Sequence, residues 1–186
     1  GGSTVVVLQP SYLPWLGYLD QMMRSDHFVL LDTVSFDKNG WRNRNRILFE
    51  GEPKWLTVPV QQSGRFGQQL SDVEVAESGW ANRHIQTIKQ AYRQQKGLKE
   101  VLEIIQPILE YGHSSLVDLN AAILTSVSGR LGFSCKIHRA SALPASSERS
   151  QRLIDICMQL GASTYLSGAA AKSYLDLAKF EAADIE

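Results

Sequence analysis

The segment WRNRNRI places three arginines, Arg42, Arg44 and Arg46, at alternate positions. In an extended strand, alternate side chains point to the same face, so these guanidinium groups would share one face, with Asn43 and Asn45 on the other. Guanidinium groups bind phosphate and carboxylate through paired hydrogen bonds. The spacing therefore predicts an anion-binding surface. A solvated edge strand, whose charges discourage aggregation, gives the same pattern and stays open as the alternative.

Two residues of the sequence have side chains suited to acid–base chemistry at a site. Asp32 ends the apolar run HFVLLD, where a carboxylate can bind a ribose or an amine, or can cap a turn. His84 lies in the helical pattern WANRHIQTIKQAY, where an isolated histidine is more often structural. We name Asp32 and His84 as the candidate catalytic residues, and leave their structural roles open.

No metal site is expected from the sequence. The four histidines show neither H-x-x-H nor H-E-x-x-H spacing, and the two cysteines have no partner at metal-ligand spacing. Cys135 and Cys157 lie in apolar surroundings, which favours buried free thiols, with a catalytic thiol as the alternative.

The stretch QPSYLPWLGY could supply the walls of a ligand pocket. Tyr12, Trp15 and Tyr18 offer rigid aromatic surface, and Gly17 would allow a close approach of the backbone to a ligand. In the alternative, Trp15 and Leu19 belong to the core and the prolines only stiffen a turn. We predict ligand contact for this stretch because it follows the first predicted strand.

A second loop, in YLSGAAAKSYLD, could bind an anion. Ser167 and Gly168 lie where a strand is expected to pass into a helix, and Lys172 lies one turn further. Free N–H groups at a helix start favour an anion. The signal is weaker than a P-loop because G-x-x-x-x-G-K-[ST] is absent.

The elements that must position these residues follow from the hydrophobic pattern. Core strands are expected over 4–9, 27–32, 133–140 and 163–166, and a hairpin over 47–49 and 55–60. A further short strand is expected in VEV, over 73–75. Helices are expected over about 14–25, in three segments between 80 and 131, over 148–161 with Ser147 as its cap, and over 167–180.

This order predicts a three-layer, Rossmann-like α/β fold with a mostly parallel sheet and an inserted hairpin and helical segment, in a single domain over 1–186. In such sheets, ligands bind beyond the carboxyl ends of the strands. Those ends are Gln9–Pro10, Asp32–Thr33, Arg139 and Ser167–Gly168. The four loops there are expected to form one site.

The overall charge limits the classes of partner. Lys+Arg and Asp+Glu are both 19, so the net charge is zero, which argues against a general nucleic-acid or membrane-surface binder but leaves a local basic site open. The partner that we expect is a small-molecule substrate. No apolar run approaches the about 20 residues that span a bilayer. The N-terminal residues show no signal-peptide pattern, and we expect a cytoplasmic location.

The segments QPSYLPWLGYLDQ, DHFVLLDTVSFDKNGWRNRNRI, WLTVPV and TYLSG resemble the WbqC-like protein family over nearly the whole chain. The resemblance implies a bacterial protein of O-antigen or other surface-polysaccharide biosynthesis, for which glycyl transfer has been suggested. It does not supply catalytic residues. Ser35 stands where family members usually have glutamine, and the resemblance implies a further C-terminal segment that we expect this sequence to lack.

A more distant likeness is to the nucleotidylyltransferase and synthetase superfamily (the HUP class), in which an H-x-G-H turn and a later S-S-T-x-I-R helix start bind nucleotide phosphates. Here Trp15 and Tyr18 replace the two histidines, and Lys172 takes the arginine position. The likeness implies a nucleotide or a nucleotide-activated donor as ligand. Indole and phenol groups do not replace imidazolium as proton donors, so ordinary nucleotidyl transfer is not expected. A binding module without catalysis is the other alternative.

Overall fold

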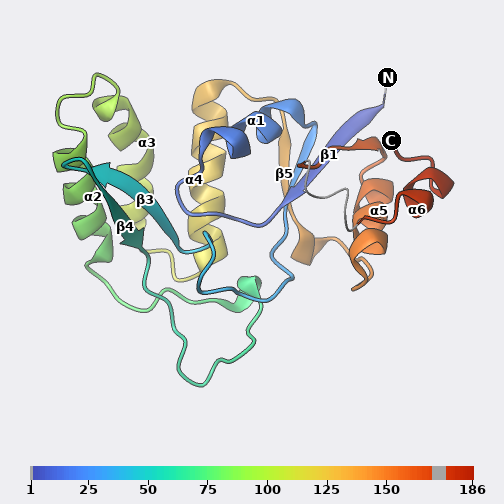
Figure 1. Ribbon diagram of the computed structural model, residues 1–186, viewed down its shortest axis with the longest axis horizontal. Coiled ribbons are helices and arrows are strands. Elements are labelled where there is room, and N and C mark those ends of the chain that lie inside the picture. The colour runs from blue at the N-terminus through green and yellow to red at the C-terminus, as the bar shows by residue number, and fades with distance from the viewer. Residues whose placement is uncertain (1, 169–174) are drawn as a thin grey trace. The chain divides into compact units, whose positions relative to one another are not determined.

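The computed structural model describes residues 2–168 and 175–186 (Figure 1). Contacts within the chain divide it into two compact units. Unit 1 consists of Gly1–Gln9, Trp15–Asp32 and Gly132–Glu186, and unit 2 of Pro10–Pro14 and Thr33–Leu131. The single WbqC-like domain over 1–186 stays a prediction.

Unit 1 contains a four-stranded parallel sheet with the order β5-β2-β1-β6. The expected β–α–β units at the two ends of the chain are therefore confirmed. Its strands are β1 (Ser3–Leu8), β2 (His27–Leu30), β5 (Lys136–Arg139) and β6 (Ala162–Tyr165), and its helices are α1 (Leu16–Arg24), α5 (Arg149–Gln159) and α6 (Leu177–Ala182).

The sheet of unit 1 is covered on both faces, as Figure 1 shows for α1 and for α5 and α6. On one face, Tyr18 of α1 packs against Phe28 of β2, with ring centroids 5.4 Å apart. On the other face, Val5, Val7 and Val29 join a buried cluster with residues of α5 and α6. Alternate residues of β1 thus point to opposite faces of the sheet. The sheet with helices on both faces makes the three layers expected from the sequence.

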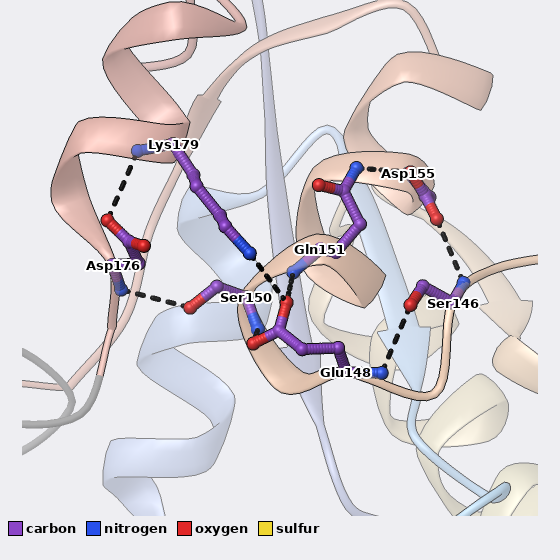
Figure 2. A network of polar contacts seen from close by, with 7 residues as sticks. All are labelled: Ser146, Glu148, Ser150, Gln151, Asp155, Asp176 and Lys179. Atoms are coloured by element: carbon purple, nitrogen blue, oxygen red, sulfur yellow. Dashed lines mark hydrogen bonds and ion pairs between the residues drawn. The ribbon is translucent and has the colours of Figure 1, made fainter.

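Two short helices of unit 1 begin with acidic caps, drawn in Figure 2. The carboxylate of Glu148 accepts hydrogen bonds from the N–H groups of Ser150 and Gln151, and Asp176 caps α6 through Lys179 N–H. The prediction of Ser147 as the cap of α5 is wrong by one residue. Of the helix expected over 167–180, residues 169–174 lie outside the described residues. Ser167 and Gly168 are not helical, and α6 spans Leu177–Ala182.

Unit 2 holds the hairpin of β3 (Arg44–Phe49) and β4 (Glu52–Thr57), followed by α2 (Trp80–Ala91), α3 (Leu98–Tyr111) and α4 (Leu116–Leu131). The three helices expected between 80 and 131 are confirmed. Ser115 caps α4, since its hydroxyl accepts from the N–H of Asp118. The VEV segment forms isolated bridges to Val60 and Ser115 and not the short strand expected.

The core of unit 2 is a separate apolar cluster, in which Leu56 and Val58 of the hairpin region meet side chains of all three helices. Tyr12 also belongs to this core, although it lies only a few residues beyond β1. Among the described residues, the helices are all too short or too polar to cross a membrane.

Candidate functional site

Three predicted site residues follow strand ends at one edge of the sheet of unit 1. Gln9 comes directly after β1, Asp32 two residues after β2, and Ser167 two residues after β6. Because all pairings in this sheet are parallel, the carboxyl ends share an edge. Gly168 follows Ser167 and is exposed, and Lys172 lies outside the described residues.

Asp32 is buried and bonded to the turn that follows β5. One carboxylate oxygen accepts from Ser141 N–H at 2.8 Å, and the other accepts from the Ser141 hydroxyl at 2.6 Å. The Asp32 carboxylate, beyond the end of β2, therefore holds the exposed Ser141 in place beyond the end of the neighbouring strand β5. Ser141 was not predicted from the sequence because it belongs to no motif. Its place beside Asp32 follows only from the pairing of β2 with β5.

The aromatic residues around the start of α1 have different environments. Trp15 is 61% exposed, so the alternative that it belongs to the core is not what the structure shows. A Cβ at Gly17 would lie 1.8 Å from the Trp15 ring, so a side chain there would require this exposed indole to move. Tyr18 is buried, and its hydroxyl donates to the carbonyl of Gln9 at 3.0 Å, which ties the helix to the end of β1.

Tyr12 and His84 form a buried pair in unit 2. The Tyr12 hydroxyl lies 2.7 Å from His84 Nδ1, and His84 Nε2 lies 3.1 Å from the carbonyl of Thr57. Since a carbonyl can only accept, Nε2 carries the proton and Nδ1 accepts from Tyr12. Burial lowers the pKa of His84 to about 4, with the charge of Arg83 adding to this effect and the Thr57 bond opposing it. Burial also raises the pKa of Tyr12 far above its usual range.

Both predicted roles of this pair stay predictions. Tyr12 is fully buried and His84 is 6% exposed, and both ring nitrogens of His84 are bonded to protein groups. The imidazole is neutral at pH 7, as a general base must be, but the bond from Tyr12 occupies the nitrogen that would take a proton.

The arginine segment has the alternation that its sequence indicates. Asn43 donates to the carbonyl of Val58 and Asn45 to those of Tyr12 and Leu13, so both amides point into unit 2. Arg44 and Arg46 lie on the opposite, outer face of β3, and Arg42 lies in the bend before it.

Two tryptophans beside these arginines were not predicted as site residues. Trp41 and Trp55 have ring centroids 5.3 Å apart and are 41% and 42% exposed. The hairpin predicted over 47–49 and 55–60 did not include Arg46, so its register gave no signal for them. In the structure the hairpin strands span Arg44–Phe49 and Glu52–Thr57, and Trp55 pairs with Arg46.

Other features of the described residues offer little chemistry. No group of three or more histidine, cysteine or acidic side chains there could hold a metal ion. A shallow groove along one face of α3 contains none of the predicted site residues. Cys157 is buried and burial raises the pKa of its thiol to about 11, which makes it a poor nucleophile.

The geometry defines a mixed α/β protein with polar groups at the carboxyl edge of a parallel sheet and a cationic, aromatic hairpin. A model of the WbqC-like protein family matches residues 9–186, and the chain belongs to this family. The resemblance noted in the sequence is thereby confirmed.

A curated relative supports the same assignment. The chain is 33% identical over 178 residues to a Mycobacterium tuberculosis protein titled "Uncharacterized protein Rv1507c", and the match covers 95% of this chain and 77% of the relative. The comparison with solved structures gives no match.

Proposed function

We propose that this protein is a cytoplasmic group-transfer enzyme of bacterial surface-polysaccharide biosynthesis, such as that of O-antigen. The group transferred is a glycyl or other acyl group, and the acceptor is an amino sugar or a nucleotide-sugar. The chain belongs to the WbqC-like family. The biosynthetic setting and the glycyl transfer are what the resemblance to this family implies.

The observation that carries the proposal is the strand order β5-β2-β1-β6 with parallel pairing throughout. From β1 the chain continues to β2 on one side, whereas β6 lies on the other side of β1. In open parallel sheets, ligands bind where the strand order reverses, beyond the carboxyl ends. We assign this order to the Rossmann-like arrangement of nucleotide-binding folds. On that assignment, a nucleotide-activated donor binds beyond the carboxyl ends of β1 and β6.

The residues at that edge have complementary properties. Gln9 and Ser167 supply polar groups at the ends of β1 and β6, and Trp15 presents an exposed ring at the start of α1. For phosphate or carboxylate binding, we assign Arg42, Arg44 and Arg46, which all lie in unit 2 and form a separate candidate surface there. Lys172, also predicted for this role, lies outside the described residues.

The proposed chemistry is acyl transfer. The acceptor amine attacks the carbonyl carbon of the activated acyl group, a carbon–nitrogen bond forms, and the bond to the activating group breaks with its electron pair. The nitrogen then loses a proton to a base. Asp32 is the candidate in unit 1, acting through the Ser141 hydroxyl that it orients, and His84 is the candidate in unit 2.

Calorimetric titration with free nucleotides and with UDP- and dTDP-amino sugars tests the binding step. We expect at least one to bind with a Kd below about 1 mM, equivalent to about −4 kcal/mol. Mass spectrometry of the acceptor after incubation with glycyl donors tests the transfer, which Asp32→Asn should reduce by about 100-fold or more. Absence of binding across this panel would contradict the proposed donor class.

A second function is favoured by one observation. Both oxygens of Asp32 and both ring nitrogens of His84 are bonded to protein groups, as in residues that hold a structure together. A ligand-binding module without catalysis predicts binding without turnover. In that case Asp32→Asn and His84→Gln variants that remain folded would retain full ligand affinity.

A further inference from the structure

The outer face of the β3–β4 hairpin in unit 2 combines exposed aromatic rings with guanidinium groups. Arg46 is paired with Trp55 across the hairpin, and Arg44 with Thr57. Since directly paired residues of antiparallel strands share a face, Arg44, Arg46 and Trp55 lie on the same surface. Trp41 completes it through its ring contact with Trp55. We call these four residues, Trp41, Arg44, Arg46 and Trp55, the hairpin face.

The two indoles of the hairpin face are held together and yet stay open to solvent. Their centroids are 5.3 Å apart, their planes are inclined by 35°, and each side chain is about two-fifths exposed. Large aromatic rings contribute most when they are buried, and exposed tryptophan is enriched where a ligand or partner covers it. The arrangement therefore offers stacking surface to a ligand.

Arg44 is fixed in place. Its Nε donates to the carbonyl of Gly40 at 3.1 Å and one Nη donates to that of Asn39 at 2.6 Å, while the guanidinium lies 4.1 Å from the centre of the Trp55 ring. This charge is positioned before any ligand arrives, which reduces the entropy lost on binding.

The side-chain N–H groups of Arg46 are available for hydrogen bonds to a ligand. Its guanidinium lies 5.2 Å from the Trp55 ring and 5.5 Å from the Trp41 ring. Within residues 2–168 and 175–186, no acceptor for its side-chain N–H groups is recorded. A guanidinium stacked on an aromatic ring keeps its N–H groups in its own plane, where they can bind a phosphate at two points.

The charge around the hairpin face also favours an anion. Between residues 37 and 46 the sequence has four cationic side chains (Lys38, Arg42, Arg44 and Arg46) and one carboxylate, Asp37, in a chain whose net charge is zero. Four cations are too few for a groove that follows a nucleic-acid backbone. Two guanidinium groups suit a di- or trianionic diphosphate better than a single carboxylate.

We propose that the hairpin face binds a nucleoside diphosphate, with the base stacked on Trp41 and Trp55 and the diphosphate held by Arg44 and Arg46. The proposal rests on the proposed function only for the class of ligand, a nucleotide. All four residues of the hairpin face lie in unit 2, and the strand ends of unit 1 take no part in this site.

Fluorescence titration of the full chain with UDP, dTDP, ADP and GDP tests the proposal. A base that stacks on Trp41 and Trp55 quenches their emission. We expect saturable quenching with at least one of the four, and Kd values that rise with added KCl because the charges are exposed. Arg46→Gln should weaken binding about tenfold, the usual effect of losing a charge-assisted hydrogen bond. Trp41→Ala should weaken it to a similar degree.

Lys54→Gln is the matched control for Arg46→Gln. Lys54 is also a hairpin cation, but it pairs with Ile47 and lies against Phe49, away from the hairpin face. The Lys54→Gln variant should bind the nucleotide with the same Kd as the native chain. Thermal unfolding of each variant shows whether it is folded, and the exposure of Arg46 and Trp41 predicts unchanged midpoints.

Three results would overturn the proposal. Equal Kd values for Arg46→Gln and the native chain, or equal effects of Arg46→Gln and Lys54→Gln, exclude specific recognition of the phosphates. Equal affinity for uridine and UDP, or for pyrophosphate and UDP, excludes joint recognition of base and diphosphate. Much tighter binding of an oligouridine than of UDP would identify a nucleic-acid surface.

Failure of this inference is distinct from failure of the proposed function. If the acyl-transfer product forms but the hairpin variants bind the nucleotide normally, the hairpin assignment alone is wrong. If hairpin-dependent nucleotide binding is found and no transfer product forms with any donor, the group-transfer function is wrong and the binding site stands.

Discussion

At the scale of single residues, the Tyr12–His84 pair shows how buried polar groups are satisfied in unit 2. Tyr12→Phe removes the only described donor to His84 Nδ1 and leaves a buried acceptor unpaired. We expect a loss of about 1–3 kcal/mol in the free energy of unfolding. Urea denaturation measures it. Tyr111→Phe, at an exposed tyrosine, should change stability by less than about 0.5 kcal/mol. Equal effects of the two variants would mean that the hydrogen bond is not stabilising.

The titration of His84 gives a pH prediction. Its pKa is about 4 in the folded chain against 6.5 for an unperturbed histidine, so the unfolded chain binds the proton more readily. The stabilisation from the neutral imidazole is complete above pH 6.5 and is lost as the pH falls toward 4. The loss is about 3 kcal/mol if the full shift is expressed.

The experiment compares unfolding free energies of the native chain and His84→Gln between pH 4 and 7. The variant should lack this part of the pH dependence. The variant is needed because a second histidine also loses stabilisation as the pH falls. Burial lowers the pKa of His138, and the charges of His27 and Lys136 add to this effect. Parallel pH curves for the native chain and His84→Gln would contradict the assignment.

At the scale of elements, the start of α5 depends on one side chain. Hydrogen bonds from the N–H groups of Gln151 and Ser150 lower the pKa of Glu148, with Lys179 adding to the effect. A carboxyl group with a lowered pKa stabilises the fold above its ordinary pKa, and this is lost as the pH falls through the folded value.

Glu148→Ala should therefore lower the melting temperature at pH 7, and the difference from the native chain should shrink toward pH 3. Differential scanning calorimetry at the two pH values tests both statements. Glu181→Ala is the control, because this exposed glutamate of α6 has no recorded hydrogen bond or ion pair through its side chain within the described residues. A Glu148→Ala deficit that is independent of pH would point to packing and not to the cap.

The order of elements could be predicted from the sequence because apolar runs and their breaks are local signals. The strand at HFVLLD, the helix breaks at Gly97 and Gly112, and the hairpin all follow from them. The exact caps could not be predicted: Ser147 and Glu148 are adjacent, and which one bonds to the N–H groups depends on the path of the loop. The VEV segment pairs too briefly to make a strand, a result of its neighbours and not of its own propensity.

The candidate site was predictable to a similar extent. Strand ends locate Gln9 and Asp32, since parallel pairing follows from the order of elements. The Asp32–Ser141 hydrogen bonds and the ring contact between Trp41 and Trp55 could not be predicted from composition. Each depends on a contact between segments that are apart in the sequence.

At the scale of the whole molecule, each unit has its own apolar core. The cluster with Leu119 lies entirely in unit 2 and the cluster with Ile154 entirely in unit 1. Separate cores allow separate unfolding transitions. The probes for the two are also separate, since Trp41, Trp55 and Trp80 lie in unit 2, whereas both cysteines lie in unit 1.

In a Trp15→Phe, Cys135→Ala background, tryptophan emission reports unit 2, and the reaction of a thiol reagent with buried Cys157 reports unit 1. Leu119→Ala should shift the fluorescence transition in urea by about 2–5 kcal/mol and leave Cys157 protection nearly unchanged, and Ile154→Ala should do the reverse. Each substitution leaves a cavity in one core only, so its cost falls on the unit whose packing it disrupts. If both transitions shift together in both variants, the two units unfold as one. Nucleotide binding at the hairpin face should then slow the thiol reaction of Cys157 as strongly as it stabilises the tryptophan fluorescence transition.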